Sequence, residues 1–189
     1  GASISAVEAG KCVNTSMGFT PLSGIMMGTR TGDVDPAIVT YLMEKLDKTA
    51  EEVLEIFNKK SGMLGVSGVS SDARDLENAI NAGNERALLT RNVYAERVRQ
   101  VLGGFAFQLG HVDALAFTAG LGENDSSVRE AILDLLQEAM GIKYDKTLNH
   151  QTRGEEVRIS TDDSAVEVWV VPTDEELVLA RDAFELHNE

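Results

Sequence analysis

Two glycines and two polar residues follow a short apolar run near the middle of the chain, within residues 114–124. The turn consists of Gly120, Leu121, Gly122, Glu123 and Asn124, and an amphipathic segment begins directly after it. This arrangement is typical of phosphate sites, because glycines let the backbone approach a ligand and a helix N-terminus presents free N–H groups. The third glycine of a dinucleotide fingerprint and the Gly-Lys-Ser/Thr of a Walker loop are absent from the turn. A strand-to-helix turn that binds nothing is the alternative interpretation.

A second glycine-rich stretch, residues 26–36, places Arg30 between Gly28 and Gly32. An arginine on such a loop can reach into a cleft and present its planar guanidinium group to a phosphate or a carboxylate. The alternative is a surface arginine that pairs with Asp33 or Asp35.

A third stretch, residues 67–75, consists mostly of small residues and opens a predicted helix. Its free N–H groups, its hydroxyls and Arg74 could line a nucleotide. Capping of the helix by Ser71 or Asp72 explains the same residues equally well.

A pair of carboxylates, Glu175 and Glu176, follows Pro172 at the end of a predicted strand. Glu176 lies three residues after Thr173, which is the spacing of a capping box, so it has a structural explanation. Glu175 is then free for another role, and a carboxylate at this place suits Mg²⁺, a hard cation that takes oxygen ligands. Complementarity to the helix dipole is the alternative for both residues.

Composition limits the classes of protein that the chain can represent. Its 189 residues are 43% hydrophobic and 25% charged, which is typical of a globular domain with a sizeable core. The formal net charge of −14 repels nucleic acid and anionic membranes, so we expect neither as a partner. The single Cys12 cannot form a disulfide within the chain and fits a reducing compartment, so we expect a cytoplasmic protein. We expect no signal peptide and no apolar run of the roughly 20 residues that span a bilayer.

Nucleophilic hydrolysis and zinc binding find no support in the sequence. Cys12 lies in a predicted strand with no histidine nearby, and His111, His150 and His187 are scattered along the chain. Their spacing matches no zinc motif.

The hydrophobic pattern predicts one α/β domain that begins with a strand hairpin. The expected elements are a hairpin within residues 3–16, a helix after Asp35-Pro36, a helix with a capping box at 49–52, a small-residue loop over 61–71, helices over 73–82 and 84–109, a strand over 113–118, a helix after the glycine turn, strands over 157–160 and 166–171, and a final helix. The apolar runs at 114–119 and 166–171 favour strands with helices on both faces.

Two predicted helices carry a stripe of apolar residues that we expect to be buried. In the helix over 84–109 these are Leu89, Val93, Val98, Val101, Leu102, Phe105 and Leu109, and in the helix after the glycine turn they are Val128, Ile132, Leu135, Leu136 and Ala139.

Six separated segments resemble acetate kinases of the acetokinase family. They are NTSMGFTPL at 14–22, MGTR at 27–30, NKKSG at 58–62, GVSGVSSD at 65–72, FTAGLGEN at 117–124 and PTDEEL at 172–177. The resemblance covers nearly the whole chain but only the C-terminal half of the family's length. It implies an α/β fold of the ribonuclease H-like type, a domain of the actin and sugar-kinase (ASKHA) superfamily with a mixed sheet flanked by helices.

The resemblance also implies a reaction and a set of site residues. The family transfers the γ-phosphoryl group of ATP to acetate reversibly, giving acetyl phosphate and ADP, with Mg²⁺ as the metal. Carried over to matching positions, Arg30 stabilises the transferring phosphoryl group, and Gly120, Leu121, Gly122, Glu123 and Asn124 hold the nucleotide. Asp72, Ala73 and Arg74 lie on the adenosine side, Gly1 belongs to a phosphate loop, and Glu175 supports Mg²⁺. Asp174 departs from the family, which commonly has asparagine there.

The same resemblance implies that part of the family's machinery lies outside residues 1–189. Family members contribute an arginine, a histidine and an aspartate from an N-terminal half, and they form homodimers through the C-terminal half. We therefore expect a nucleotide-binding and dimerisation domain whose first strand is missing and which is inactive alone. Propionate or butyrate kinase, and a catalytically silent nucleotide-binding and dimerisation module, are the alternative functions.

Overall fold

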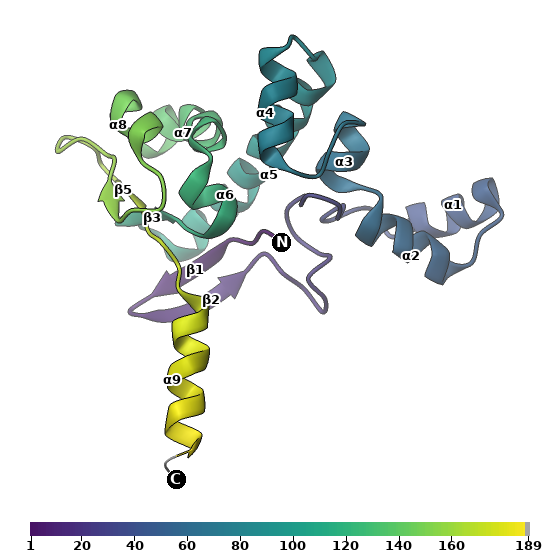
Figure 1. The fold of residues 1–189 in the computed structure, drawn as a ribbon, viewed down its shortest axis with the longest axis horizontal. Helices are drawn as coiled ribbons and strands as arrows, with labels where there is room; N and C mark the ends of the chain where they lie inside the picture. The colour runs from purple at the N-terminus through teal and green to yellow at the C-terminus, as the bar shows by residue number, and fades with distance from the viewer. Residues whose placement is uncertain (188–189) are drawn as a thin grey trace.

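A three-stranded mixed sheet lies in the body of the molecule (Figure 1). The computed structural model describes residues 1–187. Strand β3 (Ala114–Phe117) is parallel to β5 (Glu167–Val170), which is antiparallel to β4 (Val157–Arg158), so β5 is the central strand. Both predicted apolar runs therefore form strands, and the predicted strand over 157–160 is shorter than expected.

The chain begins with the predicted hairpin of β1 (Ser5–Glu8) and β2 (Lys11–Thr15). The two strands are antiparallel and form a separate two-stranded sheet. Ala9 and Gly10, at the turn, have positive φ angles of 48° and 76°. Glycine accepts this conformation without strain, which explains the tight turn at this place.

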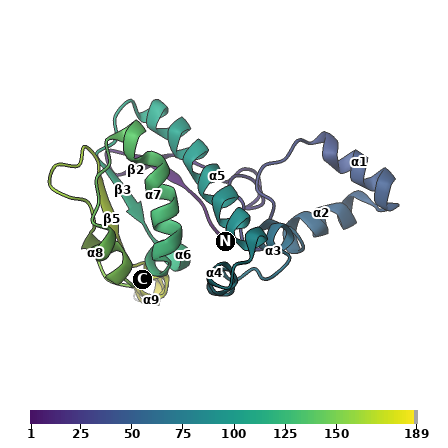
Figure 2. The same cartoon turned by 90° about the horizontal axis from the view of Figure 1, so that it is seen from above.

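Helices cover the sheet and supply most of the core (Figure 2). The long α5 (Glu85–Leu109) packs against α7 (Ser126–Met140), which also contacts α8 (Lys146–Gln151) and the short α6 (Ala119–Asn124). Strand β5 buries alternate residues against this layer, whereas Ala114 and Ala116 of β3 are exposed. Because these two side chains are exposed, the prediction that helices cover both faces is wrong for β3. One edge of β3 also pairs with no strand among the described residues.

The buried stripes of α5 and α7 differ in part from the prediction. Leu89 is 53% exposed, Leu135 is 42% exposed and Ala139 is also exposed, so these three predictions of burial are wrong. The contact face of α5 instead contains the small or polar residues Ala87, Thr90 and Ala95. Small side chains let neighbouring helices approach closely. The buried Thr90 hydroxyl donates a hydrogen bond to the Arg86 carbonyl at 2.7 Å.

Four helices lie between the hairpin and α5: α1 (Ala37–Leu46), α2 (Ala50–Lys59), α3 (Gly62–Ser67) and α4 (Ala73–Asn81). Helices α3 and α4 pack on α5, whereas α1 and α2 extend from the body (Figure 2). The predicted capping box of α2 is confirmed, with Thr49 and Glu52 as its partners. The prediction of a loop over 61–71 is wrong, because α3 forms there. Its first residue, Gly62, has a φ of 61° and lies so close to the Met27 carbonyl that a Cβ would clash.

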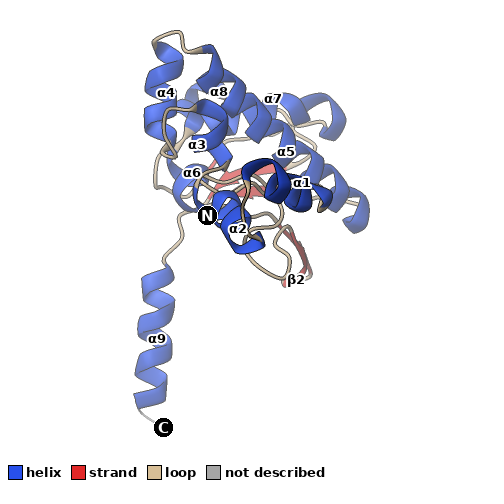
Figure 3. Cartoon of the chain, turned by 90° about the vertical axis from the view of Figure 1, so that its right-hand side faces the viewer, coloured by secondary structure: helices blue, strands red, loops and turns tan. Residues whose placement is uncertain are grey.

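The last helix, α9 (Glu175–His187), projects from the body in Figures 1 and 3. Leu179 and Leu186 on this helix are 68% and 74% exposed. Among the described residues, no helix combines the length and the apolar character needed to cross a bilayer.

Candidate functional site

The glycine turn forms the short helix α6 rather than an open loop. It begins after β3 with Ala119, whose φ of 56° is unusual for a residue with a Cβ. The backbone N–H of Ala119 donates to the Glu123 carboxylate at 2.8 Å, which stabilises this conformation. Residues held in such sparsely populated backbone conformations cluster at functional sites.

The two glycines of the turn, Gly120 and Gly122, lie in different surroundings. A Cβ on Gly122 would lie 2.9 Å from the backbone carbon of Phe117, so only glycine lets α6 pack against β3. A Cβ on Gly120 would meet nothing within 4 Å. The fold therefore requires Gly122 for packing, whereas the space beside Gly120 is open to a ligand.

Glu123 connects the turn to the segment before α9. One oxygen of its carboxylate accepts hydrogen bonds from the Thr173 N–H at 2.8 Å and the Thr173 hydroxyl at 3.0 Å, besides that from Ala119. Asn124 donates to the Gly120 carbonyl at 3.1 Å and so closes the turn. These contacts give Glu123 a positioning role in the free protein.

Arg129 supports the turn from below, and the sequence analysis missed it. Its side chain is fully buried, and all five of its N–H donors are used. They bind the carbonyls of Gly122, Glu123, Asn149 and Thr152 and the side-chain oxygen of Asn149, at 2.7–3.0 Å. Burial lowers the pKa of Arg129. Its position next to Val128, on the apolar face of α7, is the signal that could have revealed it.

The start of α4 contains a capped N-terminus and an ion pair. Asp72 is the N-cap and accepts from the Arg74 N–H at 2.8 Å, so the capping alternative holds for Asp72. The Arg74 guanidinium binds both carboxylate oxygens of Asp72, at 3.1 and 2.7 Å, and these hydrogen bonds lower the pKa of Asp72 to about 2. The Arg74 side chain is 87% exposed, so it can turn toward a ligand.

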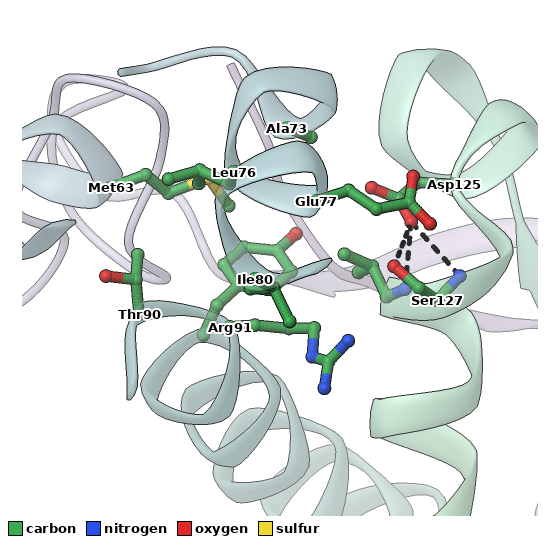
Figure 4. Close-up of a pocket in the computed structure, with 11 residues that line it drawn as sticks. Met63, Ala73, Leu76, Glu77, Ile80, Thr90, Arg91, Asp125 and Ser127 are labelled. Carbon is green, nitrogen blue, oxygen red and sulfur yellow. Dashed lines mark hydrogen bonds between the residues drawn. The ribbon is translucent and has the colours of Figure 1, made fainter. Parts of the chain in front are cut away.

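Ala73 lies close to the junction of α6 and α7, as Figure 4 shows. Between α4 and α7 is a cavity of about 20 Å³, lined by Ala73 and Glu77 on one side and by Asp125 and Ser127 on the other. The cavity is too small for more than a water molecule. It shows that the third predicted segment lies close to the residues that directly follow the first, although the two lie about 50 residues apart in the sequence.

Asp125 begins α7 at this junction. Its carboxylate accepts from the N–H groups of Ser127 and Val128 at 3.1 and 3.0 Å, as an N-cap does. Burial, together with the nearby charge of Asp125, raises the pKa of Tyr94 to about 12.

Arg30 is held by a loop that packs on α3. The N–H of Ser61 donates to the Thr29 carbonyl and that of Met63 donates to the Met27 carbonyl, both at 2.9 Å. The Arg30 guanidinium lies 3.5 Å from the Pro21 carbonyl, and a Cβ on Gly1 would lie 3.5 Å from it. No carboxylate within residues 1–187 forms an ion pair with it, so the predicted alternative of pairing with Asp33 or Asp35 is wrong.

Asp33 and Asp35 instead accept hydrogen bonds from groups of nearby residues. Asp33 accepts from the Ser23 hydroxyl and the Gly24 N–H at 2.6 and 2.8 Å, and Asp35 accepts from the Ala37 N–H at 2.9 Å. The Arg30 loop also touches the segment before α4, because a Cβ on Gly28 would lie 2.9 Å from the Ser71 carbonyl. The Arg30 loop, which lies beside Gly1, thus packs on the segment before α4. The start of α4 in turn lies across the small cavity from Asp125, which follows the α6 turn.

The start of α9 differs from the predicted capping box. Asp174 accepts from the Leu177 N–H at 2.9 Å, whereas Thr173 binds Glu123. The prediction that Thr173 and Glu176 form the box is therefore wrong, because the competing contact with Glu123 takes the threonine hydroxyl. Helix α9 begins at Glu175, whose side chain lies outside what the structure describes, so its predicted metal role stays a prediction.

The mixed sheet with flanking helices and the solved structures of similar fold define the class of protein: a ribonuclease H-like domain of the ASKHA superfamily. The sequence matches the Acetokinase family over residues 1–181, and the chain belongs to that family. It is 55% identical to the acetate kinase of Finegoldia magna over 186 residues, which are 98% of this chain and 47% of the relative. The chain thus spans about half the length of the relatives that it matches.

Solved structures agree with this assignment. The crystal structure of Porphyromonas gingivalis acetate kinase matches with a TM-score of 0.92 at 49% identity, over 98% of this chain and 46% of that one. A propionate kinase from Francisella tularensis matches with a TM-score of 0.88 at 35% identity, over 95% of this chain and 45% of that one.

Proposed function

We propose that this chain forms the nucleotide-binding half of an acetate kinase, which transfers the γ-phosphoryl group of ATP to acetate in a reversible reaction. In that reaction a carboxylate oxygen of acetate forms a bond to the γ-phosphorus, and the bond from that phosphorus to the bridging oxygen of ADP breaks. Such a transfer needs positioning and charge neutralisation more than covalent help from the protein. The observation that carries the proposal is the open space at Gly120 in α6, together with the capped start of α4, which lies across a small cavity from Asp125 at the start of α7.

Several predicted residues have a geometry that supports a role in this proposal. Gly120 lets the phosphates approach the α6 backbone, Ala73 and Arg74 lie on the adenosine side, and Arg30 faces the phosphoryl group that moves. Arg30 suits this role because no carboxylate within the described residues neutralises its charge. Gly1 lies beside Arg30, which supports its assignment to the phosphate site.

Magnesium fits the oxygen donors near the start of α9. Glu123 and Asp174 carry carboxylates there and form no ion pair within residues 1–187, and Mg²⁺ in phosphate-transfer sites is usually held by one or two carboxylates and by the phosphates. The described residues contain no cluster of three or more metal-ligating side chains. Glu175 would complete this set, and the ion would supply charge neutralisation on the phosphates.

Acetate is preferred over propionate as the proposed acceptor because the acetate kinases named above are 49–55% identical to this chain and the propionate kinase is 35% identical. We further propose a homodimer formed through this half, which the exposed Leu179 and Leu186 of α9 support. A particle mass of twice 20.4 kDa by light scattering would support the dimer, and a mass of 20.4 kDa would contradict it.

Calorimetric titration of the chain with Mg-ATP tests the nucleotide role. We expect saturable binding, and we expect Gly120→Val to abolish it by filling the space that the phosphates need. Gly104→Val is the matched control, because Gly104 is also a helical glycine with nothing within 4 Å of its Cβ position, but it lies in α5. Equal effects of the two variants, or no binding to the wild-type chain, would contradict the proposal.

A second assay addresses catalysis. An acyl-phosphate assay on the chain alone should give no robust turnover, because the proposed machinery includes the other half of the family's length. Robust turnover would contradict that part of the proposal and would leave the nucleotide site intact.

A further inference from the structure

Asn149 of α8 is a fully buried polar side chain that connects α8 to α7. Its Oδ1 accepts a hydrogen bond from the Arg129 Nε at 2.8 Å, and its Nδ2 donates to the Ser126 carbonyl at 2.9 Å. Burying an amide group is unfavourable unless hydrogen bonds compensate for the lost water. Within the described part of the chain, neither Asn149 nor Arg129 has a buried side-chain nitrogen or oxygen without a partner.

Asn149 also fixes the orientation of the Arg129 guanidinium group. That group is planar, and its N–H groups have fixed directions. Asn149 binds one edge of the plane twice, because its side-chain Oδ1 accepts from Nε and its backbone carbonyl accepts from Nη2 at 2.7 Å. Two contacts on one edge restrict rotation of the plane. They therefore set the direction of the remaining nitrogen, Nη1.

This Nη1 atom holds the end of the α6 turn. It donates to the Gly122 carbonyl at 2.8 Å and to the Glu123 carbonyl at 3.0 Å. Because each peptide unit is planar, holding these two carbonyls also fixes the direction of the N–H groups of Glu123 and Asn124. A continuous series of contacts thus runs from Asn149 through Arg129 to the candidate nucleotide turn.

Helix α8 is a firm support for this series of contacts. Its N-cap, Asp145, accepts from the Leu148 N–H at 2.9 Å, and the Asp145 N–H donates to the carbonyl of Ile159 at 2.9 Å. Ile159 is fully buried and directly follows β4. Helix α6 has only six residues, and helices this short are unstable in water without outside contacts. The turn therefore depends on contacts such as that with Arg129.

We propose that Asn149 is a positioning residue of the nucleotide site, which orients Arg129 so that the α6 turn keeps the conformation that binds the phosphates. The inference rests on the proposed nucleotide role of this turn. Asn149 acts through Arg129, since its side-chain hydrogen bonds go to Arg129 and Ser126. Loss of its side chain should therefore weaken nucleotide binding even in a chain that stays folded.

Three variants separate positioning from a merely structural role. Asn149→Leu removes both side-chain hydrogen bonds, whereas Asn149→Asp keeps an oxygen acceptor for Arg129 and loses the donor to Ser126. Ser164→Ala is the matched control, because its hydroxyl also makes two hydrogen bonds, to the Lys143 N–H and the Val166 carbonyl, and lies outside this series of contacts. Urea denaturation gives the stability of each variant, and titration calorimetry with Mg-ATP gives its dissociation constant.

The dissociation constant should follow the contact with Arg129 and not the stability. At a temperature where circular dichroism shows every variant to be folded, we expect N149L to raise the constant about fivefold or more, the effect of one net hydrogen bond, and N149D and S164A to stay within about twofold of the wild type. A constant for N149L within twofold of the wild type, or equal rises in N149L and in either other variant, would overturn the inference.

Amide hydrogen exchange of the free chain gives a second measurement that needs no nucleotide. We expect N149L to speed exchange at Glu123 and Asn124 about fivefold, and S164A to leave both rates unchanged. Unchanged rates in N149L would contradict the inference. If N149L does not fold, Asn149→Ala takes its place in both experiments.

The outcome with the wild-type chain distinguishes this inference from the proposed function. A wild-type chain that does not bind Mg-ATP would overturn the nucleotide site and, with it, the role of Asn149. A wild-type chain that binds Mg-ATP while N149L binds it equally well would overturn the role of Asn149 alone.

Discussion

At the scale of single residues, the candidate site depends on side chains that hold the backbone of α6 in place. Arg129 binds four carbonyl groups from below, and Glu123 binds the first N–H group of the turn and Thr173. Neither function can be read from a glycine motif, because both depend on segments brought together by folding. The glycines themselves were predictable, since their spacing after an apolar run is local information.

Replacement of Arg129 by methionine should strongly destabilise the chain. Arg129→Met leaves buried carbonyl groups without donors, so we expect a loss of about 3 kcal/mol or more in the free energy of unfolding. Urea denaturation measures this loss. Arg99→Met is the control, because Arg99 forms an exposed pair with Glu96 at 2.6 Å, and such pairs contribute less than about 1 kcal/mol. Equal losses in the two variants would show that Arg129 does not support the turn.

Tyr94 makes stability depend on pH in the alkaline range. Its folded-state pKa of about 12 lies above the ordinary value of 10.0, so the folded state keeps a proton that the unfolded state releases. The free energy of unfolding should therefore fall as pH rises from 10 to 12, by up to about 3 kcal/mol from this group. Tyr94→Phe removes this contribution, so its denaturation midpoints should decline less steeply than those of the wild type. If the midpoints of the wild type and of Tyr94→Phe decline in parallel as the pH rises, the raised pKa of Tyr94 is contradicted.

At the scale of elements, the sequence predicted most helices and strands and misplaced those fixed by contacts over long distances. The hairpin, α2 with its capping box, α4, α5 and the strands follow from local patterns. Helix α3 was missed because its start depends on Gly62 packing under the Met27 carbonyl, which no local pattern reveals. The cap of α9 was misassigned for the same reason, since Glu123 takes the hydroxyl of Thr173.

The start of α9 should depend on Asp174. Asp174→Ala removes the acceptor for the Leu177 N–H, and the loss of an N-cap costs about 1 kcal/mol. We expect hydrogen exchange at Leu177 to become about fivefold faster. Asp174→Asn keeps an oxygen acceptor and should leave the rate near that of the wild type. A rate that is unchanged in the alanine variant would show that the helix starts without this cap.

At the scale of the whole molecule, the chain is an acetokinase-family domain that spans about half the length of its relatives. Its Arg30 loop packs on the segment before α4, and the start of α4 lies across a small cavity from Asp125, which follows the α6 turn. The sequence indicated these segments as candidates for the site. It could not predict that Gly28 packs on Ser71, or that Ala73 and Asp125 share a cavity, because these contacts arise only in the folded chain.

Nuclear magnetic resonance of the ¹⁵N-labelled chain, titrated with Mg-ATP, tests the central claim most directly. If the α6 turn and the α4 start form one nucleotide site, the amide signals of Gly120, Gly122, Ala73 and Arg74 should shift together and give one dissociation constant. Signals that do not shift, or shifts in only one of the two segments, would contradict a shared site.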